Sequence, residues 1–448
     1  MTESVDLGGH KVRIFPVTRI QGRADIEVLF TPDQEVTEAR FRGLEFRGFE
    51  EMLSGVPAMR APSIVSRVCG SCGPFHQLAS CIAIENATGC EVPDSALWFR
   101  ELLTWLWLAF DHLLRATYMA LPDFALPMSD VGVRNVAGIY MVEQETIGRL
   151  TAVQSAFADS LALLTGLPIH PSVVVPGGVS YIPDWPSFAK VGDLMEGCEH
   201  DLREVLRLVE MLTRRNTQMI DTQTPLNGFY MSSAMREHPA LMGDCMIVAP
   251  FKGGEPRFIG HDEFYESMAE NTVAWSYVKP VTVGDFTPLL VGPMARVNVG
   301  FDTDTPWAEL EATRTHEHWG HPLDRDMLFL SAMALEVIWA WEKARLLLDQ
   351  RPRVKEPCAA IDMTEAEGLA IVESPRGSLV HHLQIGSDGE IAGYRIVSPL
   401  QFNYDLLNQH LSGFAQKSIS GVEIGEAAAQ SLQLAVRSFG PCVSCGTH

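Results

Sequence analysis

Two pairs of cysteines, one near each end of the chain, restrict the possible folds more than any other feature. The stretch RVCGSCGPFH (67–76) contains Cys69 and Cys72, and GPCVSCGTH (440–448) contains Cys442 and Cys445. A C-x-x-C spacing lets two thiolates converge on one metal ion, and two such pairs supply four sulfur ligands. Only a fold that brings the two ends of a long chain together can unite them.

The cysteine pairs by themselves leave three explanations open. Structural zinc is common for four such cysteines, although small zinc modules usually gather their ligands within a short stretch of chain. A buried catalytic metal would explain why a large fold assembles the site. A redox dithiol would account for one pair and leave the other unrelated. A histidine follows each pair, His76 in the first case and His448 in the second.

Composition and charge indicate a globular protein and exclude some partners. The 448 residues are 46% hydrophobic and carry a formal net charge of −22, which repels phosphate backbones, so we expect no nucleic acid partner. Charged residues interrupt the most apolar stretch, 97–122, which predicts a buried helix and no membrane span. No secretory signal is visible, and nine cysteines do not suggest a disulfide framework. We therefore expect a cytoplasmic location, or the cytoplasmic face of a membrane reached through partners.

Hydrophobic periodicity predicts an α+β chain that is mainly helical, with a core bundle of long helices and small peripheral β-sheets. Alternation over 10–30 predicts two strands around a bend at 19–22, and alternation over 378–399 predicts a hairpin that turns at 387–389. Apolar steps of three and four residues predict helices over 142–167, 201–216 and 327–350. We expect one domain over 1–448: a β-rich segment at 1–45, a helical core at 74–350, and a β-hairpin and metal-binding tail at 370–448.

Blocks of sequence along the whole chain resemble one enzyme family. R-x-C-G-x-C-x-x-x-H early and P-C-x-x-C-x-x-H at the end are similar to the cysteine motifs of the large, catalytic subunit of nickel-iron hydrogenases. PVTRIQGRADIEV (16–28), FRGFEEML (46–53), VGPMARV (291–297) and VESPRGSLVHH (372–382) are similar to further blocks of that family, in the same order. FRGFE and ALPDF (120–124) are more similar to its cytoplasmic branches. The resemblance implies the nickel-iron hydrogenase large-subunit fold.

The resemblance assigns the four cysteines to one nickel-iron cluster. It implies that Cys69 and Cys442 are terminal ligands of nickel, and that Cys72 and Cys445 bridge nickel to an iron that carries cyanide and carbon monoxide. Soft thiolates suit a redox-active metal pair of this kind. The implied reaction is heterolytic cleavage or formation of dihydrogen, with a terminal thiolate, Cys442, as the simplest base.

The resemblance also implies which side chains surround the cluster. Arg376 matches an arginine that overhangs the metals, where a guanidinium can polarise dihydrogen, and Pro375 precedes it in the same block. An ordinary buried ion pair is the alternative role for Arg376. His76 is implied to hydrogen-bond a bridging sulfur and not to bind metal itself.

A magnesium ion close to the C-terminus is implied as well. Glu50 and His448 match two of its ligands, and Ile396 is expected to add a backbone carbonyl, with waters completing a shell of hard donors. The alternative role for Glu50 is that of a solvated helix residue beside Glu51. In this family a tail is removed just after the final histidine once nickel is in place, so we expect a chain that ends at His448 to be the mature form.

Three positions near the expected cluster depart from the family pattern. Gln21 stands where a proton-accepting glutamate is usual, and an amide takes no proton near neutral pH. Gly440 replaces an aspartate that would partner the arginine, and Leu400 stands where a hydroxyl residue is common. We expect Asp123 to remain as the acidic neighbour of Arg376.

These features predict a hydrogenase catalytic subunit that passes electrons to an iron-sulfur small subunit, which in turn passes them to further electron-transfer subunits. The cysteines with cluster-like spacing are all assigned, so the chain is expected to hold no iron-sulfur relay of its own. Because Gln21 is expected beside Cys442, a hydrogen sensor or a low-turnover relative with an altered proton path is the second hypothesis. Structural zinc without a redox role is the third.

Overall fold

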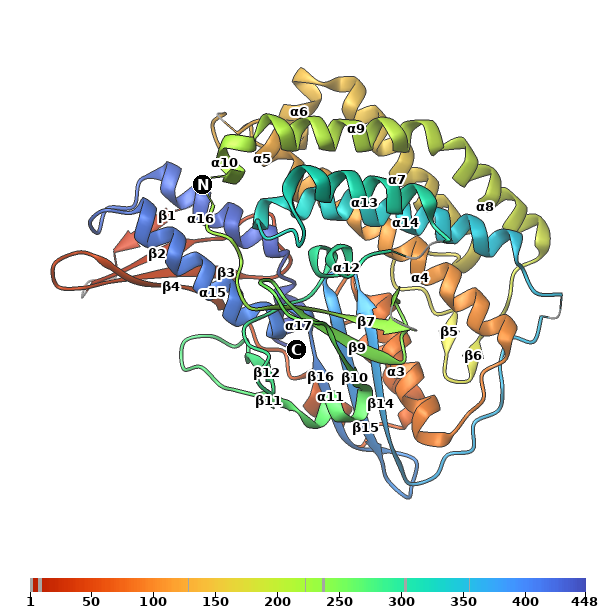
Figure 1. Ribbon diagram of the computed structural model, residues 1–448. Helices are drawn as coiled ribbons and strands as arrows, with labels where there is room; N and C mark the ends of the chain where they lie inside the picture. The colour runs from red at the N-terminus through yellow and green to blue at the C-terminus, as the bar shows by residue number, and fades with distance from the viewer. Residues whose placement is uncertain are drawn as a thin grey trace.

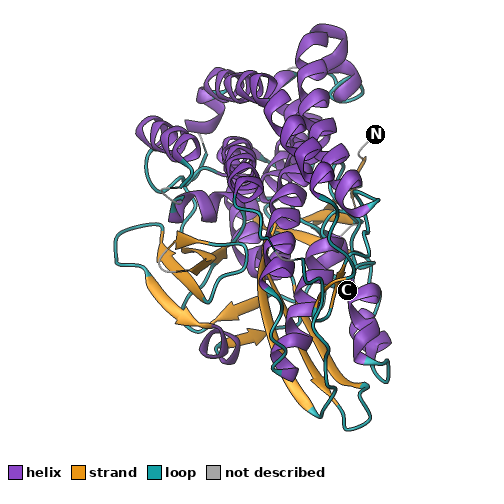
Figure 2. Cartoon of the chain, turned by 90° about the vertical axis from the view of Figure 1, so that its right-hand side faces the viewer, coloured by secondary structure: helices purple, strands orange, loops and turns teal. Residues whose placement is uncertain are grey.

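The computed structural model describes residues 3–6, 10–127, 129–221, 223–235, 238–301, 304–353 and 355–448, and for 3–6 it describes the backbone alone. Long helices fill the upper half of Figure 1, and most strands lie below them. Figure 2, turned by 90°, shows the same division. This arrangement confirms the predicted mainly helical α+β fold class.

The N-terminal part forms a four-stranded antiparallel sheet. Its strands follow one another in the order β1 (Glu3–Asp6), β2 (Lys11–Phe15), β3 (Ala24–Phe30) and β4 (Val36–Gly43). The two strands predicted around the bend at 19–22 are β2 and β3, and the alternating side chains of β2 bury Val12 and Ile14. The expected β-rich segment at 1–45 includes residues 1–2 and 7–9, which lie outside the described residues.

Long amphipathic or fully buried helices form the main core, as the periodicity predicts. The central pair is α4 (Asp94–Arg115) and α14 (Phe329–Asp349), whose Trp105 and Trp339 rings lie 4.5 Å apart between centroids. The other helices of the first 350 residues are α1 (Phe49–Leu53), α2 (Ala61–Val65), α3 (Gly73–Thr88), α5 (Leu121–Ala125), α6 (Val136–Val142), α7 (Gln144–Thr165), α8 (Trp185–Gly197), α9 (Glu199–Arg215), α10 (Thr217–Asp221), α11 (His261–Glu266), α12 (Pro293–Val299) and α13 (Pro306–Trp319). A π-helical turn, η2 (Ala116–Ala120), joins α4 to α5, and single 3₁₀ turns are η1 (Ala58–Arg60) and η3 (Asp326–Leu328).

The expectation of a helical core over all of 74–350 is wrong for residues 229–290. That stretch forms a five-stranded sheet and a two-stranded sheet. Its apolar runs are short and lie between Gly- and Pro-rich turns, which interrupt any helix. The strands are β7 (Phe229–Met235), β8 (His238–Pro239), β9 (Cys245–Pro250), β10 (Arg257–Gly260), β11 (Met268–Glu270), β12 (Val281–Val283) and β13 (Leu289–Leu290). A small earlier hairpin pairs β5 (Val174–Val175) with β6 (Gly178–Val179).

The C-terminal part returns to the N-terminal sheet and ends in the interior. Strands β14 (Ala366–Ser374), β15 (Gly377–Ile385) and β16 (Ile391–Val397) form an antiparallel sheet, and the turn between β15 and β16 contains the predicted 387–389. Helix α15 (Pro399–Ser418) lies on β4, where Asn408 Oδ1 accepts a hydrogen bond from the Phe41 amide at 2.8 Å. After α16 (Glu426–Phe439), the short helix α17 (Val443–Gly446) carries the second cysteine pair.

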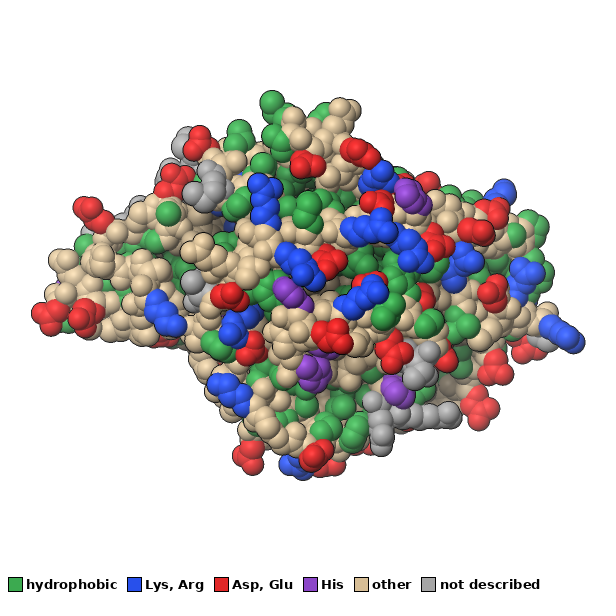
Figure 3. All heavy atoms as spheres, turned by 45° about the horizontal axis from the view of Figure 1, so that its top comes forward, with side chains coloured by type: hydrophobic (Ala, Val, Ile, Leu, Met, Phe, Trp, Pro, Cys, Tyr) green, Lys and Arg blue, Asp and Glu red, His purple; other side chains and the backbone are tan. Residues whose placement is uncertain are grey.

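The helical face shown in Figure 3 mixes acidic, basic and apolar side chains. On α9, for example, Arg203 pairs with Glu199 and Arg214 with Glu210, each one turn away. In the described part of the chain, every helix is too short or too polar to cross a lipid bilayer.

Candidate metal centre

The fold brings the two cysteine pairs into one buried cluster. Cys69 and Cys72 lie in the turn that leads into α3, and Cys442 and Cys445 lie at the start and within α17. All four Sγ atoms lie within 4.8 Å of one another, with Cys69 and Cys442 at 3.2 Å and Cys442 and Cys445 at 2.9 Å. Among the described residues this is the one group of three or more His, Cys, Asp or Glu side chains close enough to share a metal ion. The two pairs are therefore one site.

Backbone contacts from the N-terminal region fasten the two cysteine segments together. The Val443 amide donates to the carbonyl of Gln21 at 2.9 Å, and Gln21 pairs with Cys442 as an isolated β-bridge. The guanidinium of Arg47 donates to the carbonyls of both Val68 and Ser444, one residue away from a cysteine in each segment. The side chain of Arg47 thus joins both cysteine loops, and the backbone of Gln21 adds a contact to the second.

Burial and crowding perturb the thiols of the cluster. Burial raises the pKa of Cys442 and of Cys445, while hydrogen bonds from the neighbouring thiols, Cys442 first, lower the pKa of Cys69. Four thiols that share so small a space favour a bound cation, which would hold all of them as thiolates.

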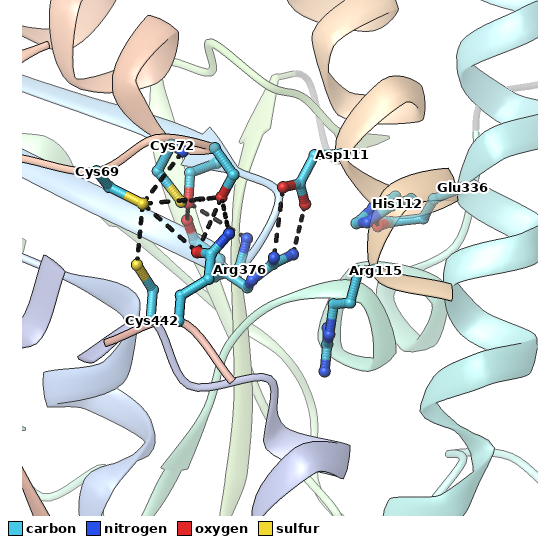
Figure 4. A network of polar contacts seen from close by, with 12 residues as sticks. Cys69, Cys72, Asp111, His112, Arg115, Glu336, Arg376 and Cys442 are labelled. Atoms are coloured by element: carbon cyan, nitrogen blue, oxygen red, sulfur yellow. Dashed lines mark hydrogen bonds and ion pairs between the residues drawn. The ribbon is translucent and has the colours of Figure 1, made fainter. Parts of the chain in front are cut away.

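Arg376 faces the cluster and pairs with Asp111, not with Asp123. Its guanidinium lies 2.5 Å from the carboxylate of Asp111, which α4 supplies, and both side chains are 4% exposed (Figure 4). Burial would lower the pKa of Arg376, but the negative charges of Asp111 and of the cysteine sulfurs outweigh it and raise that pKa. The expectation that Asp123 neighbours Arg376 is wrong: Asp123 pairs with Arg19 and Arg437 instead.

The turn between β14 and β15 crosses the segment before α12 at close range, and this crossing positions Arg376. Pro375 and Arg376 form the turn between β14 and β15, and Pro375 is buried there. Gly292, with a φ of 107°, passes so close that a Cβ on it would lie 2.7 Å from the carbonyl oxygen of Arg376. A Cβ on Gly377 would in turn meet Val291 at 2.5 Å, so both glycines are needed for the close approach.

His76 lies against the cluster at the head of a chain of hydrogen bonds. Its Nε2 lies 3.4 Å from Cys445 Sγ and its Nδ1 3.0 Å from His381 Nε2, and His381 Nδ1 lies 2.8 Å from the Tyr394 hydroxyl. Burial lowers the pKa of His76 to about 3, so the ring is neutral. If His76 donates to a Cys445 thiolate, it accepts from His381, which accepts from Tyr394, so every ring nitrogen of the chain has a partner.

The side chain of Gln21 is closest to Cys69. Its amide exchanges hydrogen bonds with the hydroxyl of Ser71 at 2.7 and 2.9 Å, and its Oε1 lies 3.4 Å from Cys69 Sγ. The expected neighbour, Cys442, is contacted by the backbone of Gln21 and not by its amide group. Sequence reasoning missed Ser71, which lies between the two cysteines of the first pair.

The three residues expected to bind magnesium lie close together, but Ile396 contacts Glu50 and does so through its N–H. His448 Nε2 lies 3.3 Å from Glu50 Oε1, and Ile396 offers its N–H, not its carbonyl, to the same oxygen at 2.7 Å. Burial would raise the pKa of Glu50, but the contacts with His448 and with the Ile396 amide outweigh it and lower that pKa. His448 Nδ1 also lies 2.6 Å from the carbonyl oxygen of Cys445, so the last residue is tied to the cysteine helix.

The two other departures lie close to the second cysteine pair: Gly440 is two residues before Cys442, and Leu400, in α15, packs against α17. Leu400 is buried and so close to α17 that a Cβ on Gly446 would meet its Cδ2 at 2.8 Å. Gly440, with a φ of 58°, lies directly under the guanidinium of Arg115. Sequence reasoning missed the roles of both Asp111 and Arg115. A signal was present, because these two opposite charges lie one helical turn apart in the apolar stretch 97–122.

Fold and site together define a protein that encloses a cysteine-bound metal centre between the two ends of its chain. A family model described as nickel-dependent hydrogenase matches residues 47–127 and 255–448. The chain is 27% identical to one subunit of the F420-non-reducing vhu hydrogenase of Methanococcus voltae, over 91% of this chain and 98% of that protein. It is 26% identical to the beta subunit of the NAD-reducing hydrogenase HoxS of Cupriavidus necator, over 98% of this chain and 94% of that protein.

A solved structure of an NAD+-reducing NiFe-hydrogenase in the H2-reduced state matches with a TM-score of 0.90 and 25% identity, over 100% of both chains. Since the family model covers more than half of the sequence, the chain belongs to the nickel-dependent hydrogenase family. It is a nickel-iron hydrogenase catalytic subunit that acts on H2, with Cys69, Cys72, Cys442 and Cys445 as its metal site.

Proposed function

We propose that the chain cleaves or forms dihydrogen at a nickel-iron cluster whose iron carries cyanide and carbon monoxide, and that it exchanges electrons with an iron-sulfur small subunit. The observation that carries the proposal is the set of four buried sulfurs within 4.8 Å of one another. Thiolates are soft, bridging donors that suit nickel and iron, whereas a structural zinc site has no need of a buried arginine above it. The bound cluster would supply the redox chemistry and the polarisation of dihydrogen.

The protein residues would hold, orient and isolate that cluster. Cys69 and Cys442 are proposed as terminal ligands of nickel, and Cys72 and Cys445 as bridges to iron. His76 would donate a hydrogen bond to the sulfur of Cys445, which lies 3.4 Å away. Cys442 is proposed as the base that accepts the proton.

Arg376 is proposed to present a fixed positive charge to the pocket in which dihydrogen reacts, with Pro375 shaping the wall beside it. Asp111 would hold the guanidinium in place through their buried ion pair, since a buried charge needs a partner to stay in one orientation. The crossing of Gly292 over the Arg376 turn supports the same role because it leaves this backbone little room to move.

We also propose a magnesium ion near Glu50 and His448. The carboxylate and the imidazole lie 3.3 Å apart, and a carboxylate oxygen is the kind of hard donor that magnesium prefers. Such an ion would tie α1 to the C-terminal helix. Ile396 would contribute by orienting Glu50 through its N–H.

A multisubunit assembly in the cytoplasm, or on the cytoplasmic face of a membrane through partners, is proposed from three observations. Both relatives compared above are named as subunits of larger hydrogenases. The described residues form no metal group other than the four-cysteine one. All nine cysteines are free thiols, as in a reducing compartment.

A low-turnover enzyme or a hydrogen sensor is the second candidate, and the amide of Gln21 favours it. The side chain next to Cys69 cannot carry a proton near neutral pH, which would slow proton exit while leaving the metal ligands in place.

The test is to purify the chain with its small subunit under anaerobic conditions and to measure metals and infrared spectra. We expect about one nickel and one iron per large subunit beyond the iron-sulfur content, with cyanide and carbon monoxide bands. Zinc in place of nickel, without those bands, would refute the proposal. If the bands are present but turnover is slow, the sensor alternative is supported.

A further inference from the structure

A second buried arginine lies beside the pocket of Arg376. Arg115 is the last residue of α4, one helical turn after Asp111, and is 3% exposed. In Figure 4 Asp111 points to Arg376, and Arg115, on the same side of the helix, extends downward below that ion pair. There its guanidinium covers Gly440, two residues before Cys442: a Cβ on that glycine would lie 2.1 Å from Arg115 Cζ. Only a residue without a side chain at 440 leaves this space open.

Arg115 has no carboxylate partner within 4.0 Å among the described residues. Its Nη2 donates to the carbonyls of Arg437 at 2.8 Å and Ser438 at 3.3 Å, and its Cζ lies 5.2 Å from the centre of the Phe329 ring. The nearby carboxylate of Asp111 is already paired with Arg376. A fully buried guanidinium without its own anion is costly unless negative charge is supplied from elsewhere.

Two carboxylates act on Arg115, but Asp111 is paired with Arg376 and Glu336 with Arg296, so the negative charge left without a cation is that of the cysteine cluster. Burial, and then the charge of Arg376, lower the pKa of Arg115, whereas Asp111 and the Cys72 sulfur act in the opposite direction. Four thiolates bring more negative charge than Arg376 neutralises, because Arg376 is shared with Asp111. A loaded centre with anionic ligands would therefore be the counter-charge that Arg115 lacks.

We propose that Arg115, seated on Gly440, is a positioning residue whose fixed positive charge balances the loaded four-cysteine centre and sets its electron density and reduction potential. The inference rests on the proposed nickel-iron cluster. It gives Gly440 a definite role: its missing side chain makes room for the guanidinium.

The test uses the holoenzyme complex with Arg115→Met, which keeps an unbranched apolar stem and removes the charge. We expect the carbon monoxide and cyanide bands to shift to lower wavenumbers, since the iron gains electron density, and the midpoint potentials of the centre to become more negative. Arg115→Lys, which keeps the charge, should leave bands and potentials closer to those of the parent. Arg207→Met, on the exposed face of α9, is the control and should change neither.

Two results would overturn the proposal. One is an Arg115→Met enzyme with the bands and potentials of the parent, whatever its thermal stability, because that would make the arginine a packing element only. The other is an Arg115→Lys enzyme that fails to load metal or shows displaced bands, because lysine retains the positive charge. This second result decides the question if Arg115→Met does not assemble. A parent complex without any such bands would instead refute the proposed cluster itself.

Discussion

At the scale of single residues, four arginines near the cysteine cluster share two acidic partners. Arg376 has Asp111, and Arg19 and Arg437 share Asp123, while Arg115 relies on backbone carbonyls. This local excess of positive charge occurs in a chain whose formal net charge is −22. The residues around the cluster are thus arranged for an anionic group.

Replacement of one ligand should disable the whole site. In Cys442→Ser, a harder and less acidic hydroxyl replaces a thiolate that lies within 3.2 Å of two other sulfurs, so we expect loss of nickel and of activity by at least a hundredfold. Metal analysis and hydrogen oxidation check this. Cys358→Ser, at an exposed free cysteine, is the matched control and should behave like the parent. Full nickel content in Cys442→Ser would contradict the ligand assignment.

The amide at position 21 should limit proton exit. Gln21→Glu would place a carboxyl group beside Ser71 and Cys69, and we expect hydrogen oxidation to rise at least tenfold, which corresponds to ~1.4 kcal/mol off the barrier. Hydrogen-deuterium exchange and the solvent isotope effect report on the same step. Gln350→Glu, at an exposed position, controls for added charge. An unchanged rate and isotope effect would mean that protons leave by another route.

At the scale of elements, the crossing of the β14–β15 turn with the segment before α12 depends on glycine. Gly292→Ala would force a side chain into a φ of 107° and against the Arg376 carbonyl, at a cost of ~1–3 kcal/mol in stability, and it should lower activity by displacing Arg376. Thermal unfolding and turnover measure the two effects.

Gly413→Ala, inside α15 where a Cβ meets nothing within 4 Å, is the matched control for Gly292→Ala. It should stabilise the protein by ~0.5–1 kcal/mol, because alanine favours the helix. If Gly292→Ala behaved like Gly413→Ala, the close approach would not be what holds the Arg376 turn.

The sequence predicts the long helices and the cysteine cluster because each leaves a local signal, but it could not predict which acid meets Arg376. Asp111 lies in α4 and Asp123 in α5, with a π-helical turn at 116–120 between them, and only the tertiary structure shows that Asp123 meets Arg19 and Arg437. In the sheet of 229–290, β7, β9 and β10 pair with strands close in the sequence, whereas β13 pairs in parallel with β7 across some sixty residues, and no local pattern encodes that last pairing.

At the scale of the whole molecule, buried neutral histidines should make stability depend on pH. Burial lowers the pKa of His316 to about 4 and also lowers those of His112 and His381. The unfolded chain binds these protons near its ordinary pKa of 6.5, so their contribution is complete above that pH and declines as the pH falls toward 4. Denaturant unfolding at pH 7 and pH 5 should show the loss.

His316→Gln should reduce that loss between pH 7 and pH 5, because one half-buried ring no longer has to stay neutral in the folded state. His10→Gln, at an exposed position, is the control and should leave the pH dependence as it is in the parent. An identical decline in His316→Gln and the parent would contradict the assignment to this ring.

Activity should require the assembled complex. The cluster is buried, and the described residues hold no other metal group that could carry electrons to the surface, so the chain alone should show negligible dye reduction with hydrogen. Addition of the iron-sulfur small subunit should restore it. A fully active isolated chain would contradict the proposed electron path.

The position of the ligands along the chain has one further effect, on the unfolded ensemble. Cys69 and Cys442 are separated by 373 positions, so a metal held by both closes a loop that contains most of the polypeptide. In the chain-entropy treatment of cross-links, a loop of this length removes ~6 kcal/mol worth of freedom from the unfolded chain. While it stays bound, the metal thus cross-links the two ends of the chain. Its loss would return that conformational entropy to the unfolded state and lower the stability of the whole fold.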